Sequence, residues 1–120
     1  MVLVDTSVWV AHFKSPNSRL IELLITDDVC CHPLIIAELA CGTPPQPRTT
    51  TLKDFSLLKT STIATMQEVL AFIEQHKTYG KGCGYVDIAL LASALLSKET
   101  KLWTLDKRLR KLAIEFNLDF

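Results

Sequence analysis

The chain has 120 residues, 48% of them apolar and 22% charged, a balance that excludes wholesale disorder. Thirteen basic and thirteen acidic residues cancel, so no global field draws the protein to nucleic acid or to a membrane surface. Binding to a polyanion would need a local basic patch or a bound cation. The length suits one domain over residues 1–120, large enough for its own hydrophobic core.

The cysteines and the apolar segments bear on where the protein works. Cys30, Cys31, Cys41 and Cys83 show no CxxC spacing and are expected to be buried free thiols in a reducing compartment. The N-terminal apolar run contains Asp5 and follows no basic segment, which is unlike a signal peptide. The longest apolar run, IALLASALLS, is about half of the ~20 residues that cross a membrane. We expect a soluble, cytoplasmic protein.

Short strands and helices are expected to alternate along the first half of the chain. The apolar residues 2–4 predict a buried strand, and a short helix follows over residues 8–13. Asn17-Ser18 is a capping signal for a helix over residues 19–25, and a second strand is expected at residues 29–31. Pro33 suits the first turn of the next helix, and Gly42 suits its end.

The second half continues the alternation and defines the fold class. GTPPQPRTT, residues 42–50, predicts a loop, followed by a helix over residues 52–59, a weak strand around Ile63 and a helix over residues 66–77. After the loop YGKGCG come a long helix over residues 85–99, a strand over residues 101–106 and a final helix over residues 107–116. Strands separated by helices predict an α/β protein, a three-layer α/β/α sandwich with a central parallel sheet.

Four acids occupy unusual positions in this scheme. Asp5 follows the first expected strand and Asp106 ends the last one, where ligands gather in open parallel sheets. Glu38 is the only fully charged residue between Asp28 and Arg48, and Asp87 begins a helix that is apolar almost all round. Each acid has an ordinary explanation as well. Asp5 and Asp106 can cap helices, Glu38 can face solvent, and Asp87 can complement a helix dipole.

Taken together, the acids predict a cation site. Two carboxylates ~4 Å apart repel each other by ~4 kcal/mol at an effective dielectric constant of 20. A cluster of four therefore needs a counter-ion or raised pKa values. Ligand sets made only of oxygen select hard cations, so Mg²⁺, or Mn²⁺ in its place, is expected.

Several segments resemble the PIN-domain family, and most closely its VapC-type ribonuclease toxins of bacterial toxin–antitoxin modules. They are VDTSVW, the helical Glu38, GKGCGYVDIALLASAL and LWTLDKRL, in the family's order over nearly the whole chain. The resemblance implies a parallel α/β/α sandwich that cleaves RNA with Mg²⁺ held by Asp5, Glu38, Asp87 and Asp106. It also implies a homodimer held inactive by a small VapB-type antitoxin, in a heterotetramer or a larger assembly.

Other residues have a weaker link to chemistry. Ser7 and Thr104 each lie two residues from a key Asp, where a hydroxyl can bind a ligand or a metal-bound water, or serve as an ordinary turn residue. Lys81 is expected to be a solvated loop lysine, and GKGCG lacks the spacing of a dinucleotide fingerprint. The basic run that follows Asp106 is either a solvated helix face or a contact for RNA backbone.

Two rival functions follow from the same fold class. A receiver-type phosphoacceptor domain requires an acidic pair after the first strand and a lysine after the last one. It also requires an acceptor Asp at the end of the third strand. Here Asp5 is followed by Thr6 and Ser7, the weak strand at Ile63 ends in Ala64-Thr65, and the last strand ends in Asp106 followed by Lys107, so the fit is poor. A non-catalytic interaction module of the PIN fold would be favoured by loss of one of the four acids, and none is missing.

Overall fold

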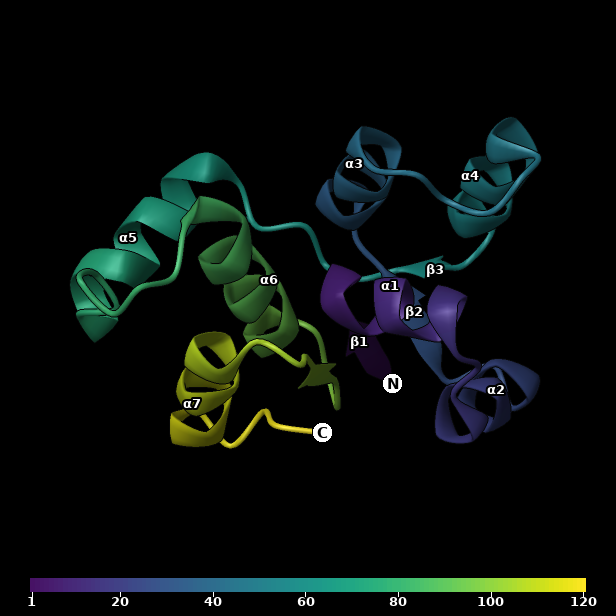
Figure 1. Ribbon diagram of the computed structural model, residues 1–120. Coiled ribbons are helices and arrows are strands. Elements are labelled where there is room, and N and C mark those ends of the chain that lie inside the picture. Colours follow the sequence, from purple (N-terminus) through teal and green to yellow (C-terminus); the bar gives the residue numbers. More distant parts are fainter.

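A parallel sheet of four strands lies between two groups of helices in the computed structural model, which describes residues 1–120 (Figure 1). The strands are β1 (Val2–Val4), β2 (Val29–Cys31), β3 (Lys59–Thr60) and β4 (Lys101–Trp103). The helices are α1 (Thr6–Lys14), α2 (Ser18–Ile25), α3 (Pro33–Cys41), α4 (Arg48–Ser56), α5 (Met66–His76), α6 (Tyr85–Leu96) and α7 (Lys107–Glu115). Helices α5 to α7 gather on one side of the strands and α1 to α4 on the other, which confirms the predicted α/β/α architecture.

The strand order β3-β2-β1-β4 creates the crevice that matters for function. The chain moves outward from β1 to β2 and β3, then crosses back to place β4 on the other side of β1. Such a reversal is the point at which open parallel sheets bind ligands, outside the carboxyl ends of the strands. Here the crevice lies beyond β1 and β4, where Asp5 and the segment 104–106 follow.

The core explains why β1, β2 and α6 could be predicted. Strands β1 and β2 are buried at every position, as expected for central strands covered by helices on both faces. Helix α6 is buried at seven consecutive positions, Ile88 to Ala94, so the prediction of a helix with almost no polar face is confirmed. Trp9 is buried against Phe55, with ring centroids 4.6 Å apart in an edge-on arrangement.

Two predictions about the middle of the chain were wrong. The third strand is not at Ile63, whose side chain is exposed, but at Lys59–Thr60, which pairs with Cys30 and Cys31 of β2. This edge strand has two exposed polar residues and hence no apolar signature. Helix α4 starts at Arg48 and ends at Ser56, not at residues 52–59, so its first turn lies inside the segment predicted to be a loop. Arg48 secures this turn by donating from its guanidinium to the carbonyl oxygen of Ala40.

Smaller differences concern element ends and thiols. Helix α6 ends at Leu96, where Ser97 bonds back to the Ser93 carbonyl, instead of at residue 99. Strand β4 ends at Trp103, so Asp106 does not end the strand but caps α7. All four cysteines are free, and Cys30 and Cys31 are buried as predicted, but Cys41 is exposed and Cys83 is partly exposed. Cys41 lies in the last turn of α3.

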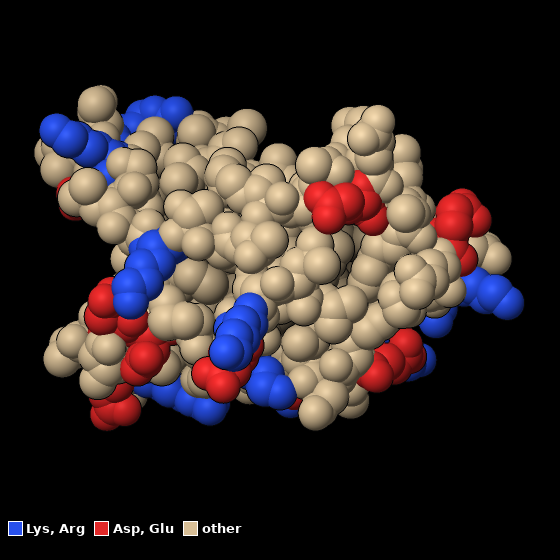
Figure 2. Space-filling view, turned by 180° about the vertical axis from the view of Figure 1, so that it is seen from behind, with Lys and Arg blue, Asp and Glu red and all other residues tan.

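The surface agrees with the balanced composition. Figure 2 shows acidic and basic side chains interspersed along the lower part of one face, with no extended region of a single charge. None of the helices combines the length and the apolar character that crossing a membrane requires.

His32 closes β2 and starts α3. Its side chain is buried, and its Nδ1 accepts a hydrogen bond from the backbone N–H of Leu34 at 3.0 Å, which caps the helix. Its Nε2 is buried without a partner, and burial lowers the pKa of His32 from its ordinary value of 6.5. Between the lowered and the ordinary value, the unfolded chain binds a proton that the folded chain does not bind. Folded-state stability is therefore complete above the ordinary value and falls as the pH drops below it.

We predict that His32→Asn reduces the loss of stability between pH 7 and pH 5.5, since asparagine can cap the helix and does not titrate. The contribution of one histidine is limited to about 1.4 kcal/mol per pH unit. Urea unfolding at both pH values measures the change in the free energy of unfolding. His76→Asn, at an exposed site on α5, is the control and should keep the acid loss of the wild type. Equal losses in the wild type and His32→Asn would contradict this role.

Candidate active site

Asp5 is the first residue after β1 and is only 6% exposed. Its backbone N–H donates to the carbonyl oxygen of Trp103 at 2.9 Å, which ties it to the end of β4. Its Oδ2 accepts hydrogen bonds from Ser7 Oγ at 2.6 Å and Thr104 Oγ1 at 2.8 Å. The capping contact from the Ser7 N–H is long, at 3.4 Å, and reaches the same oxygen. Oδ1 takes part in no hydrogen bond, so one oxygen of this buried carboxylate is free for a ligand.

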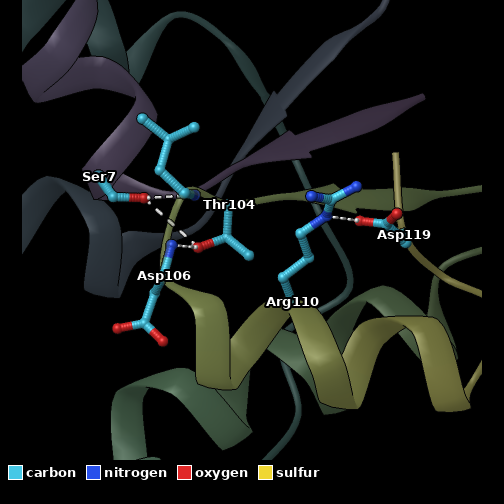
Figure 3. Close-up of polar contacts among 6 residues, drawn as sticks. Ser7, Thr104, Asp106, Arg110 and Asp119 are labelled. Carbon is cyan, nitrogen blue, oxygen red and sulfur yellow. Dashed lines mark hydrogen bonds and ion pairs between the residues drawn. The ribbon is translucent and has the colours of Figure 1, made fainter.

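Ser7 and Thr104 hold Asp5 in this orientation through their hydroxyl groups. Figure 3 shows these two side chains beside Asp106 and the turn before α7. Ser7 Oγ also accepts from the Leu105 N–H at 3.0 Å, and Thr104 Oγ1 accepts from the Asp106 N–H at 3.1 Å. Each hydroxyl therefore donates a hydrogen bond to Asp5 and accepts one from the turn before α7. The two hydroxyl oxygens lie 3.4 Å apart, with both protons directed to the carboxylate. These residues position an acid and the following turn, which is more than a routine role for turn hydroxyls.

Glu38 projects from α3, where it is exposed, and its Oε1 accepts a hydrogen bond of 2.7 Å from Thr6 Oγ1. Thr6 is the first residue of α1, so this bond links α1 to α3 beside Asp5. Sequence reasoning did not single out Thr6. The available signal was its position next to Asp5, in the first turn of the helix that follows the first strand.

Asp87 lies in the first turn of α6 and is half-buried. Its Oδ2 accepts a long hydrogen bond of 3.4 Å from the Gly84 N–H. Burial raises the pKa of Asp87, and repulsion from Asp5, Asp106 and Glu38 raises it further, while the bond from Gly84 acts in the opposite direction. The charges of Asp5, Asp106 and Glu38 therefore act on Asp87.

Asp106 caps α7, because its Oδ1 accepts from the N–H groups of Arg108 at 2.9 Å and Leu109 at 3.0 Å. The ordinary capping role is thus present, and it leaves Oδ2 without a partner. The charges of these acids also act on the neighbouring Cys83. Burial first, and then the charges of Asp87 and Asp106, raise the pKa of its thiol to about 11, and Arg108 lowers it.

Together the acids have the donor chemistry of a hard-cation site. None of the four forms an ion pair with Lys or Arg, since the ion pairs of the chain are Lys59–Asp27, Lys81–Glu115 and Arg110–Asp119. In this arrangement no three His, Cys, Asp or Glu side chains lie close enough to hold one ion jointly. Mg²⁺ commonly takes one or two carboxylates and keeps several waters, so the free oxygens of Asp5, Asp87 and Asp106 suit it.

A cavity of about 530 Å³ adjoins the acids on the side of Glu38. It runs between α1 and α3 to the proline-rich segment, and Phe13, Lys14 and Pro44 contribute to its walls. Of the four acids, Glu38 is the one that lines this cavity.

Comparison with known proteins agrees with this geometry. Residues 2–115 match the PIN domain family. Ribonuclease VapC32 of Mycobacterium tuberculosis is 43% identical to the chain over 115 residues, which are 96% of this chain and 92% of the relative, and the same values hold for that protein in a second strain. The chain therefore belongs to the PIN domain family, among its VapC toxin ribonucleases.

Proposed function

We propose that this toxin ribonuclease hydrolyses RNA phosphodiester bonds with a divalent cation at Asp5, Glu38, Asp87 and Asp106. Mg²⁺ is the proposed cation and Mn²⁺ a substitute. The observation that carries the proposal is a set of four carboxylates with which no basic side chain pairs. Burial, and then the charges of the other three acids, raise the pKa of Asp87. A bound cation would relieve this repulsion, and the relief is binding energy that a neutral site could not supply.

Each residue has a distinct part in this proposal. Asp5 would bind the cation through Oδ1, because Oδ2 is occupied by the hydroxyls of Ser7 and Thr104. Asp87 and Asp106 would bind through the carboxylate oxygens that make no capping bond, and Glu38 would hold water near the cation from α3. When bound, Mg²⁺ supplies an activated water and positive charge for the scissile phosphate.

We propose that RNA is the substrate, that a VapB-type antitoxin is the inhibitor, and that the cytoplasm is the compartment. Membership among the VapC ribonucleases supports these three assignments. The rival receiver function gains no support, since Asp5 is followed by Thr6 and Ser7 and β3 ends in Thr60 where that function needs an acceptor Asp.

We also propose a homodimer, which would form a heterotetramer or a larger assembly with the antitoxin. Exposed apolar side chains on two helices in contact support it, Met66 and Leu70 on α5 and Leu95 and Leu96 on α6. A second copy would cover this α5–α6 face, and specific dimers bury about 1,200–2,000 Å² in total.

We predict that the purified protein cleaves RNA with Mg²⁺ or Mn²⁺ and not in excess EDTA, because every proposed ligand is a carboxylate. Gel analysis of a labelled RNA follows the reaction, and restoration by added Mg²⁺ shows that the enzyme survived chelation. An Asp87→Asn preparation, purified in parallel, controls for contaminating nucleases. Undiminished cleavage in EDTA by the wild type alone would eliminate the metal mechanism.

We predict that Asp5→Asn keeps or raises stability without metal, because it removes one charge from a self-repelling group and asparagine can still cap α1. The variant should lose most of the stabilisation given by ~10 mM Mg²⁺, which is about 1.4 kcal/mol for a millimolar site. RNA cleavage should collapse at the same time. Melting curves with and without Mg²⁺ measure the effect.

Asp54→Asn, an exposed change on α4, is the matched control for that measurement and should respond to Mg²⁺ like the wild type. Equal metal-induced shifts in Asp5→Asn and the wild type, with cleavage intact, would show that Asp5 only caps a helix.

We predict that light scattering at tens of micromolar gives twice the mass of one chain, and that Leu70→Glu gives the monomer mass. Leu70 is exposed on α5, so a glutamate there, buried by a second copy, would oppose association. Ile25→Glu, at an exposed site on α2, should leave the dimer intact. A monomeric wild type under these conditions would disprove the homodimer.

A further inference from the structure

A second cavity, of about 330 Å³, lies between the loop before α6 and the helix α7. Its charged lining consists of Lys81, Arg108, Lys111 and Glu115. Lys81 Nζ is 3.8 Å from Glu115 Oε2, whereas the guanidinium of Arg108 and the ammonium of Lys111 have neither an ion pair nor a hydrogen bond. The cavity therefore carries an excess of positive charge in a chain whose net charge is zero. We call Lys81, Arg108 and Lys111 the basic pocket.

Gly82 gives the basic pocket its shape. Its φ of +81° lies in the region that favours glycine, and a Cβ built there would stand 2.6 Å from Arg108 Cδ and 2.9 Å from Arg108 Nε. The side chain of Arg108 thus lies directly against the loop backbone, and a side chain at position 82 would displace it from this position. The start of α6 does not require this contact, since Gly84 is the residue that precedes that helix and bonds Asp87.

The basic pocket adjoins the acidic crevice. Arg108 is the second residue of α7, and its backbone N–H bonds Asp106 Oδ1 at 2.9 Å. Cys83 lies close to both regions, because Arg108 lowers the pKa of its thiol while Asp87 and Asp106 raise it. An RNA strand that brings one phosphate to the acids can therefore bring another phosphate to the basic pocket.

We propose that Lys81, Arg108 and Lys111 bind a backbone phosphate of the RNA strand beside the acidic crevice. The unpaired guanidinium is the main ligand, since it can donate two parallel hydrogen bonds to phosphate oxygens. Such a contact holds the strand without reading its sequence, and it offsets the repulsion between RNA and the acids. The choice of RNA as the partner rests on the proposed function, but the contact itself does not depend on catalysis.

Binding without cleavage tests the proposal. The probe is a fluorescein-labelled single-stranded RNA of about 20 nucleotides, in excess EDTA, with anisotropy measured at several salt concentrations. Arg108→Gln should weaken binding by about tenfold or more and lower the slope of log K against log salt by ~0.7, the value for one lost phosphate contact on a single strand.

The matched control is Arg110→Gln on the same helix, which removes the same charge two residues further along. Arg110 is already paired with Asp119 at 3.4 Å and points away from Asp106 (Figure 3). Its replacement should change affinity by less than twofold. Equal effects of the two changes, no effect of Arg108→Gln, or no RNA binding by the wild type would overturn the proposal that the basic pocket binds RNA.

Gly82→Ala separates position from charge, because it keeps Arg108 and adds the methyl group that displaces it. A severalfold loss of affinity is expected, with thermal unfolding used to verify that the variant is folded. A folded Gly82→Ala protein that binds like the wild type would overturn the role of the loop, and if it does not fold, the arginine pair decides. Failure of metal-dependent cleavage with this binding pattern intact would count against the proposed function alone.

Discussion

The structure of the site depends on one oxygen atom, Asp5 Oδ2, which accepts hydrogen bonds from the hydroxyls of Ser7 and Thr104. A buried carboxylate without partners would cost several kcal/mol, and these two bonds make its burial tolerable. The same hydroxyls accept hydrogen bonds from backbone N–H groups in the turn before α7. The end of β1, the start of α1 and the turn after β4 therefore share a single hydrogen-bonded centre, and the geometry of Asp106 follows from that of Asp5.

The strand order makes this centre possible and also concentrates charge there. Because β4 lies beside β1, the acids that follow the two strands meet at one edge, and α6 adds Asp87 from the layer above. The raised pKa of Asp87 reflects both burial and this crowding. The apolar core formed by the strands and α6 offsets the destabilisation that this group of acids causes. Such an exchange of stability for function is common at enzyme sites.

Sequence periodicity was sufficient to predict the parts of the fold that bury apolar surface. Strands β1 and β2 and helix α6 have side chains that only a covered position explains, and the acids stood out against that background. The edge strand β3 was missed because Lys59 and Thr60 are held by backbone bonds to β2, which leave no trace in side-chain type. The contacts of Thr6 with Glu38 and of Gly82 with Arg108 were equally invisible, since each depends on how distant segments pack.

The bond between Thr104 and Asp5 joins residues 99 positions apart in the chain. During synthesis on the ribosome, β1 and α1 emerge first, but Asp5 has no Thr104 hydroxyl to accept until β4 and the start of α7 have left the exit tunnel. The candidate active site therefore assembles only when the segment after β4 has packed against the end of β1. A chain that stopped before residue 104 would lack both Asp106 and the Thr104 hydroxyl that supports Asp5, so truncation at this end would remove two parts of the candidate site at once.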